Sequence, residues 1–167
     1  MLSKRNLPIC PNLIAVSLPS KDSWAYEELY DTVFEADQNA IIEKTRYRGV
    51  FLIYLSVKIE KVANNFLQYQ HAFLSRVLPI KYCGNELNVI IKSLNELPKG
   101  YIKLMMHLRE PIKNKINEDE IINIIKEEGY NITKKSNYVL AVESIDDLII
   151  SGNGIIRKCG PSCIIIY

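Results

Sequence analysis

The first half of the chain alternates between short apolar runs and segments whose apolar residues recur at helical spacing. The apolar runs at 13–18, 50–57 and 72–80 and the more polar segment 41–47 predict four strands, because each is short and bounded by proline, glycine or polar residues. Two segments between them place apolar residues on one helix face: Tyr26, Leu29, Tyr30, Val33 and Phe34, then Ile59, Val62, Ala63, Phe66 and Leu67. The β-α-β-β-α-β order is typical of a ferredoxin-like unit, which we expect to fill residues 1–80.

Two local signals support this order. Ser20 or Ser23 precedes the first helical segment and is a candidate N-cap, since a serine hydroxyl can accept a free N–H of the first turn. Arg48-Gly49 separates the second and third strands, and the glycine suits the tight turn of a hairpin.

The second half, residues 81–167, has a different order of elements. Apolar spacing predicts a helix from Leu87 to Leu97, and strict alternation of apolar and polar residues predicts a strand over 101–109. Asn117 followed by Glu120 predicts a capping box at the start of a helix that ends near Glu128. Further short strands are expected at 138–143, 147–150 and 163–167. We therefore expect a second α/β domain with a mixed sheet, packed directly on the first.

Two polar segments in this half are predicted to be turns. Ser151-Gly152-Asn153-Gly154 lies between two apolar runs, and Asn-Gly is typical of a tight hairpin turn. Asp146 and Asp147 are adjacent, so on a strand they point to opposite faces. A solvated turn is a better interpretation of this pair than a catalytic carboxylate dyad.

Basic and acidic residues are unevenly distributed along the chain, although their numbers are nearly equal. The formal net charge is only +2, with 21 basic and 19 acidic residues. Residues 99–115 hold five basic residues and one acid, whereas residues 118–128 hold five acids and one base. The acidic run begins where the positive end of a predicted helix dipole stabilises carboxylates, so it has a structural explanation. The basic run does not.

The apolar content of 48% is enough for a core, yet no stretch approaches the roughly 18 uncharged apolar residues of a membrane span. Residues 1–8 contain two basic residues but no apolar run of signal-peptide length, so a cytoplasmic location is expected. Of the four cysteines only Cys159 and Cys163 are close in sequence, and zinc usually requires two close pairs of ligands. We expect no metal and no cofactor; whether Cys159 and Cys163 are bonded stays open.

Catalytic motifs are lacking. Neither His71 nor His107 lies in a nucleophile-elbow motif, and the chain has no Walker A loop, no dinucleotide fingerprint and no His-Glu-x-x-His motif. The segment 46–51 resembles the phosphate loop of acylphosphatases, but it joins the second and third strands instead of following the first. Because of this difference, an acylphosphatase-like enzyme is only the alternative hypothesis. We expect a protein that is not an enzyme and takes no small-molecule substrate.

Basic clusters near strands of one predicted sheet favour nucleic-acid binding instead. Several lysine contacts to phosphates would make the binding strongly salt-dependent, and an aromatic ring on the same strand can stack on a base. The candidate RNA-binding residues are Arg46, Arg48, Lys99, Tyr101, Lys103, His107, Arg109, Lys113, Lys115, Lys134, Lys135, Arg157 and Lys158. A solvated surface lysine is the simpler explanation for any one cluster alone. A protein-interaction module without RNA is a third possibility.

Three segments, 43–53, 75–80 and 137–143, resemble the first-domain hairpin, the junction strand and a late strand of THUMP-domain proteins. The chain is most similar to the stand-alone kind, which joins a ferredoxin-like domain to THUMP and assists tRNA cytidine acetylation. The same domain pair opens 4-thiouridine synthetases and some tRNA methyltransferases, where a catalytic module follows. The resemblance implies recognition of the tRNA acceptor stem and 3′ end, with a separate acetyltransferase as partner.

The chain departs from the family at one strand. The first THUMP strand is usually rich in Arg and Lys. Lys103 and Arg109 match basic positions of that strand, whereas Met105 and His107 do not. We expect compensation from four nearby lysines, namely Lys113, Lys115, Lys134 and Lys135.

Overall fold

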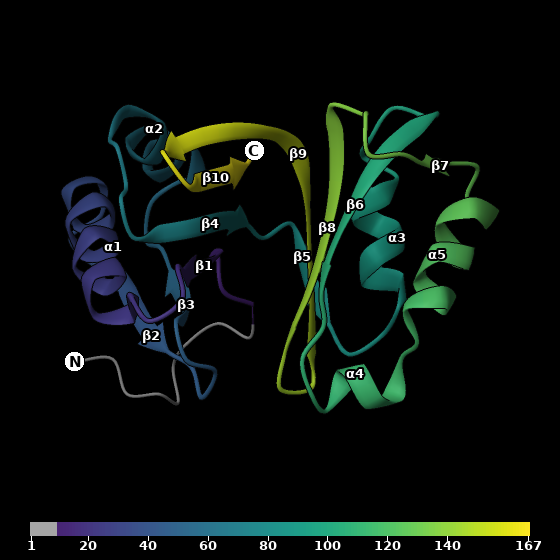
Figure 1. The fold of residues 1–167 in the computed structure, drawn as a ribbon, viewed down its shortest axis with the longest axis horizontal. Helices are drawn as coiled ribbons and strands as arrows, with labels where there is room; N and C mark the ends of the chain where they lie inside the picture. The colour runs from purple at the N-terminus through teal and green to yellow at the C-terminus, as the bar shows by residue number, and fades with distance from the viewer. Residues whose placement is uncertain (1–9) are drawn as a thin grey trace. The chain divides into compact units, whose positions relative to one another are not determined.

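The computed structural model describes residues 10–167, so residues 1–8, where no signal peptide is expected, lie outside the described part. The chain forms two compact units. The first comprises residues up to Pro79 together with Arg157–Ile165 and Tyr167, and the second comprises Ile80–Ile156 with Ile166. Both combine helices with a β-sheet, which confirms the predicted α/β class with a mixed sheet (Figure 1).

The first unit has the predicted β-α-β-β-α-β order. Its elements are β1 (Leu13–Ser17), α1 (Asp22–Ala36), β2 (Ile41–Lys44), β3 (Val50–Tyr54), α2 (Ile59–Gln68) and β4 (Leu74–Pro79). The strands lie in the order β2-β3-β1-β4 and each neighbouring pair is antiparallel. Both helices cover one face of this sheet, where Leu29, Val33 and Phe66 pack against strand residues such as Leu13 and Phe51.

The predicted serine caps of α1 are wrong. The residue before the helix is Lys21, and no side chain caps the first turn. Ser20 instead occupies a left-handed turn with φ of 63°. The chain turns into the helix through backbone hydrogen bonds, in which the Lys21 N–H donates to the Leu18 carbonyl and the Ala25 N–H donates to the Lys21 carbonyl.

The second unit is built on β6. Its elements are β5 (Tyr82–Gly84), α3 (Asn88–Leu94), β6 (Tyr101–His107), α4 (Ile112–Lys115), α5 (Glu118–Glu127), β7 (Asn131–Ile132), β8 (Tyr138–Ile145) and the first part of β9 (Leu148–Gly160). β6 pairs in parallel with β7 and β8, whereas β8 and β9 are antiparallel. The predicted alternation along β6 and the Asn117–Glu120 capping box of α5 are both confirmed.

The predicted hairpin turn at residues 151–154 is wrong, because these residues lie inside β9 and are largely buried. Gly152 and Gly154 lie opposite Ala141 and Val139 of β8. The Asn153 side chain donates to the Ser93 carbonyl at 2.8 Å and to the Glu96 carboxylate at 2.7 Å, which ties β9 to the end of α3. The turn before β9 is formed by Asp146, with φ of 51°, and Asp147, both exposed as predicted.

The C-terminal segment differs from the expected 81–167 domain. β9 begins in the second unit and ends in the first, and β10 (Cys163–Ile166) pairs in parallel with β4, Ile164 lying opposite Arg76. A disulfide joins Cys159 to Cys163 across the turn between these strands. Residues 157–165 therefore complete the first unit, because the free edge of β4 offers their strand a hydrogen-bonding partner.

Two further observations concern residues 10–167. None of the helices in this part of the chain is long and apolar enough to cross a membrane. The same residues contain no group of three or more histidine, cysteine or acidic side chains that is arranged to hold a metal ion.

Candidate nucleic-acid interface

An exposed group of tyrosines and lysines lies where β6 and β8 begin. Tyr101, the first residue of β6, is 66% exposed, and Tyr138, the first residue of β8, is 40% exposed. The Ser136 hydroxyl donates to the Tyr101 carbonyl at 2.7 Å and accepts the Tyr138 N–H at 3.1 Å, which holds the two strand starts together. We call this group the tyrosine edge and define it as Tyr101, Lys134, Lys135, Ser136 and Tyr138.

The turn that carries the two lysines is fixed by hydrogen bonds. The Thr133 N–H donates to the Ile102 carbonyl at 2.8 Å, and the Lys135 N–H donates to the Thr133 hydroxyl at 3.3 Å. Lys134 and Lys135 are exposed, and Lys135 lines an open pocket of about 300 Å³ with Tyr101. The tyrosine edge thus presents two cationic groups beside two aromatic rings, a combination that suits phosphates and stacked bases.

Tyr138 is not among the RNA-binding residues predicted from the sequence. The sequence does contain a signal for its exposure, because Tyr138 follows the polar turn 133–137 and directly precedes the buried residues of β8. Its exposure depends on the parallel pairing of β8 with β6, in which Lys103 lies opposite Val139. This parallel register brings the first residues of β6 and β8 close together, and the spacing of residues in the sequence does not reveal the pairing.

Lys99 is predicted to bind phosphate but has a structural role. Its ammonium group donates to the Glu128 carbonyl at 2.6 Å and lies 4.4 Å from the centre of the Tyr130 ring. A cation at this place stabilises the C-terminal end of α5, where the helix dipole is negative. Lys103 is half-buried on β6, so it is less open to a ligand than Lys134 and Lys135.

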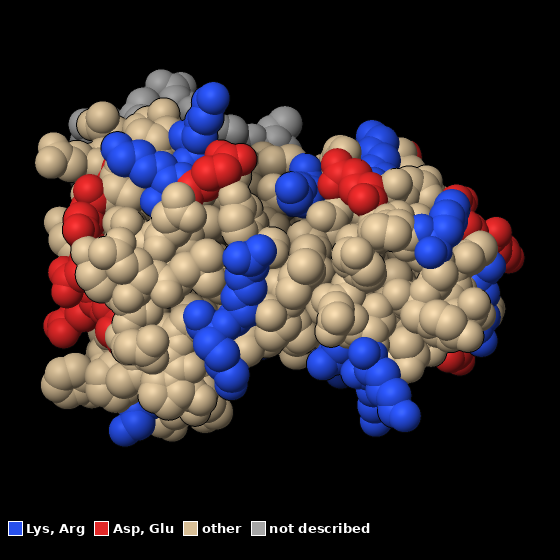
Figure 2. Space-filling model, turned by 90° about the horizontal axis from the view of Figure 1, so that it is seen from above, with Lys and Arg blue, Asp and Glu red and all other residues tan. Residues whose placement is uncertain are grey.

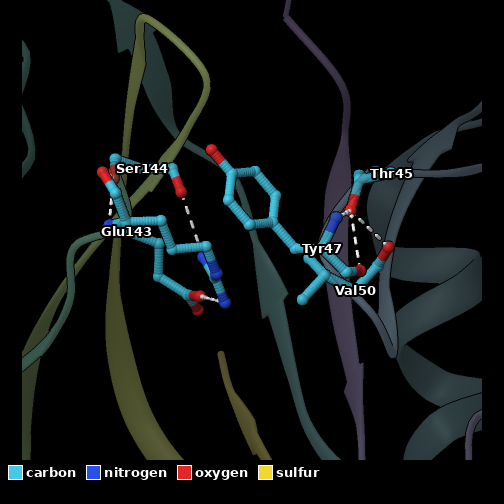
Figure 3. A network of polar contacts seen from close by, with 6 residues as sticks. Thr45, Tyr47, Val50, Glu143 and Ser144 are labelled. Carbon is cyan, nitrogen blue, oxygen red and sulfur yellow. Dashed lines mark hydrogen bonds and ion pairs between the residues drawn. The ribbon is translucent and has the colours of Figure 1, made fainter. Parts of the chain in front are cut away.

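The other basic residues of the 99–115 run lie at the far end of β6. At about 3.3 Å per residue, its seven residues place His107 roughly 20 Å from Tyr101. Arg109 is held by β8, with its guanidinium 3.1 Å from the Glu143 carboxylate and 3.1 Å from the Ser144 carbonyl (Figure 3). Lys115 lies 3.5 Å from the Asp147 carboxylate. The basic run is therefore divided between two ends of one strand.

Lys113 and Lys115 also share an open pocket with carboxylates. This pocket, of about 640 Å³, lies between α4 and the first turn of α5 and includes Glu118, Asp119 and Glu120. Negative side chains there reduce its attraction for RNA phosphates. The far end of β6 is consequently a weaker candidate than the tyrosine edge.

The four remaining predicted residues belong to the first unit. Arg157 and Lys158 are exposed near the end of β9. Arg46 lies over the ring of its neighbour Tyr47, and Arg48 is 3.3 Å from the Asp22 carboxylate. Of the predicted residues, the structure brings Tyr101, Lys134 and Lys135 together, in one group with Tyr138.

The acylphosphatase-like loop of residues 46–51 is arranged by its own hydrogen bonds. The Thr45 hydroxyl lies within hydrogen-bonding distance of the Tyr47 and Val50 carbonyls, at 3.1 and 2.9 Å (Figure 3). Gly49 has φ of 76° and approaches the Ser17 hydroxyl too closely for a Cβ atom to fit. A small pocket beside this loop includes the Asp22 carboxylate together with Arg48. That carboxylate would oppose an incoming phosphate.

Comparison with known proteins finds similarity of fold but not of sequence. No family model matches the sequence, and no curated relative matches it. Its fold is shared, at low sequence identity, by solved structures that include the following three. PH1313 from Pyrococcus horikoshii Ot3 is 13% identical with a TM-score of 0.60, over 87% of this chain and 57% of that one.

The second is a 4-thiouridine synthetase in complex with RNA and ATP, 13% identical with a TM-score of 0.55, over 86% and 41% of the two chains. The third is TrmN from Thermus thermophilus, 14% identical with a TM-score of 0.50, over 84% and 44%. The chain thus spans about half the length of these proteins. The likeness shows the fold that the chain shares with these three structures.

Proposed function

We propose that this chain binds tRNA and presents it to a separate modification enzyme. The observation that carries the proposal is the tyrosine edge, on a fold shared with a 4-thiouridine synthetase solved in complex with RNA. Tyr101 and Tyr138 offer exposed rings to unstacked bases, and Lys134 and Lys135 offer charge to phosphates. A single-stranded end is the part of tRNA whose bases are free to stack in this way.

The stem of the tRNA would be recognised by shape and charge. A-form helices are read through their phosphates and 2′-hydroxyls, so base-specific contacts are not required for this part. The predicted basic residues outside the tyrosine edge, including Lys103, Lys113, Arg157 and Lys158, are candidates for such contacts. The proposed footprint is therefore the acceptor stem together with the 3′ end.

The modification enzyme is proposed to be a cytidine acetyltransferase, as the resemblance to stand-alone THUMP proteins implies. In this proposal the chain needs no cofactor and performs no chemistry itself. The acylphosphatase-like alternative is disfavoured by Asp22, whose carboxylate lies 3.3 Å from Arg48 in the pocket that a phosphate would enter. Hydrolysis of a small acyl phosphate by the purified protein would favour that alternative.

The test is binding of the purified protein to intact tRNA across a salt series, beside the same tRNA lacking its 3′ single strand. We expect binding that weakens steeply with salt and weakens again when the 3′ strand is removed. Equal affinity for both RNAs would place the contacts away from the 3′ end. Absence of binding at low salt would contradict the proposal for the isolated chain.

A further inference from the structure

The outer face of α1 exposes aromatic rings and carboxylates together. Trp24 is 57% exposed and Tyr30 47% exposed, and the neighbouring Glu27 and Asp31 are exposed as well. Trp24, Glu27, Asp31 and Phe34 follow one another at spacings of three or four residues, so they form one stripe. We call Trp24, Glu27, Tyr30, Asp31 and Phe34 the α1 outer face. The opposite side of α1 is buried in the core.

The rings of this face are held in place by neighbouring rings. The Trp24 ring centre lies 5.7 Å from that of Phe73, and the Tyr30 ring centre lies 4.2 Å from that of Phe34. Such pairs are pre-oriented, so a partner that covers them loses little side-chain entropy. Two exposed large aromatic residues on one surface helix are also typical of interface anchors.

The acidic residues of α1 differ in whether they have structural partners. Glu28 accepts the Ala72 and Phe73 N–H groups at 2.6 and 2.5 Å, and Glu35 accepts the Tyr69 hydroxyl at 2.6 Å, so both have structural partners. Within residues 10–167, Glu27 and Asp31 have no hydrogen-bond or ion-pair partner.

The negative charges of Glu27 and Asp31 destabilise α1. Glu27 and Asp31, and again Asp31 and Glu35, are like charges four residues apart, each pair destabilising a helix by about 0.2–0.5 kcal/mol. α1 contains no Lys or Arg that offsets them. The acids of α5 differ, because they occupy its first turn, where the helix dipole favours them. Acidic side chains accordingly gather along the left edge of Figure 2, the edge that α1 occupies in Figure 1.

A pocket beside the α1 outer face suits one cationic side chain. It has a volume of about 370 Å³, with Glu28, Asp31 and Glu35 among its lining residues, together with Tyr69 and His71. His71 does not offer a free ring nitrogen, because one nitrogen lies 2.7 Å from the Thr32 hydroxyl and the other 2.7 Å from the Cys159 carbonyl. The pocket is therefore dominated by carboxylates and a tyrosine ring, which attract ammonium and guanidinium groups.

We propose that the α1 outer face is a docking surface for a basic amphipathic segment of another protein. Apolar side chains of that segment would cover Trp24 and Tyr30, and a Lys or Arg would enter the pocket beside Asp31. The negative charge repels phosphates, so the occupant is a protein segment rather than RNA. This surface goes beyond the tyrosine edge and does not depend on RNA binding by the second unit.

Trp24 makes the proposal directly testable, because it is the single tryptophan of the chain. The probe is a synthetic amphipathic helical peptide of lysine and leucine, titrated while the Trp24 emission is recorded. We expect a saturable blue shift, since a covering peptide removes the indole from water. We expect Asp31→Lys or Glu27→Lys to weaken the apparent affinity about tenfold, equivalent to about 1.4 kcal/mol.

The matched control is Glu127→Lys, an equal charge change at an exposed position of α5. It should leave the titration unchanged. A peptide whose lysines are replaced by glutamate should give no saturable shift, because the carboxylates of this surface repel it. Equal weakening by Glu127→Lys, or the lack of any saturable shift, would overturn the proposal. A shift caused by tRNA or by raising the protein concentration would also overturn it, in favour of RNA or a second copy. Unchanged tRNA affinity of Asp31→Lys would separate this surface from the proposed RNA site.

Discussion

The Arg109 guanidinium lies 3.1 Å from the carboxylate of Glu143, whose side chain is only 2% exposed. The Arg109 guanidinium also donates to the Ser144 carbonyl, and the backbone N–H of Arg109 donates to the Ser144 hydroxyl at 2.6 Å. The residue thus joins the end of β6 to β8 as part of the interior. Its charge balances a buried carboxylate and is less available to RNA than its place in a basic run indicates.

Removal of Glu143 should consequently destabilise the protein strongly. We expect Glu143→Ala to lower the free energy of unfolding by about 3–5 kcal/mol, because it leaves the Arg109 charge largely buried without this carboxylate. Urea denaturation measures the change. Asp147→Ala removes the exposed partner of Lys115 and should change stability by less than about 1 kcal/mol. Similar small effects of both substitutions would show that the Arg109–Glu143 pair is not important for stability.

Tyr101 and Tyr138 should contribute to RNA affinity rather than to stability. We expect Tyr101→Ala and Tyr138→Ala each to weaken tRNA binding on the order of tenfold, because loss of one ring–base stack costs about 1–3 kcal/mol. Both side chains are substantially exposed, so the free energy of unfolding should change little. Fluorescence anisotropy with labelled tRNA measures the affinity.

Tyr30→Ala is the matched control for these two variants, because it removes a comparably exposed tyrosine from α1. It should leave tRNA affinity unchanged. If tRNA lacking its 3′ single strand showed the same loss on Tyr101→Ala as intact tRNA, stacking on that strand would be excluded as the cause.

The four lysines expected to compensate for the weakly basic strand should not act equally. Lys134 and Lys135 are exposed beside the tyrosine edge, whereas Lys115 faces Asp147 and shares a pocket with three acids. We expect the double variant of Lys134 and Lys135 to alanine to reduce the salt slope of binding by about two, one for each lost phosphate contact. The matching double variant of Lys113 and Lys115 should have a smaller effect. Unchanged affinity after alanine replacement of all four would contradict the compensation itself.

Elements determined by residues close together in sequence could be predicted from the spacing of apolar residues and from capping residues. The helix of Ile59–Gln68 follows from apolar residues at helical spacing, and the start of α5 follows from the Asn117 side chain, which accepts the Asp119 N–H at 2.9 Å. The strand β6 follows from strict alternation. Each of these signals lies within about ten residues, so no knowledge of distant partners was needed.

Features set by distant partners were not predictable in this way. Ile164 lies opposite Arg76, far away in sequence, and this pairing assigns the C-terminal segment to the first unit. Gly160 shows the same dependence, because a Cβ atom there would overlap the His71 carbonyl. Likewise, Arg109 and Lys113 look equivalent in sequence, and only the position of Glu143 on β8 distinguishes a buried ion pair from an exposed lysine.

The Asp37 carboxylate should make stability depend on pH in the acidic range. Burial raises its pKa, but hydrogen bonds from the Ser56 hydroxyl and N–H and from the Asn39 N–H outweigh burial and leave the pKa below its ordinary value. The unfolded chain therefore takes up this proton at a higher pH, about 4, than the native state does. The stabilisation is complete above that pH and is lost as the pH falls through the lower native pKa. We expect Asp37→Asn to be less stable at neutral pH and to have a shallower acid dependence in urea denaturation at a series of pH values. The exposed control Asp147→Asn should retain the parent slope, and a parent-like slope in Asp37→Asn would contradict the assignment.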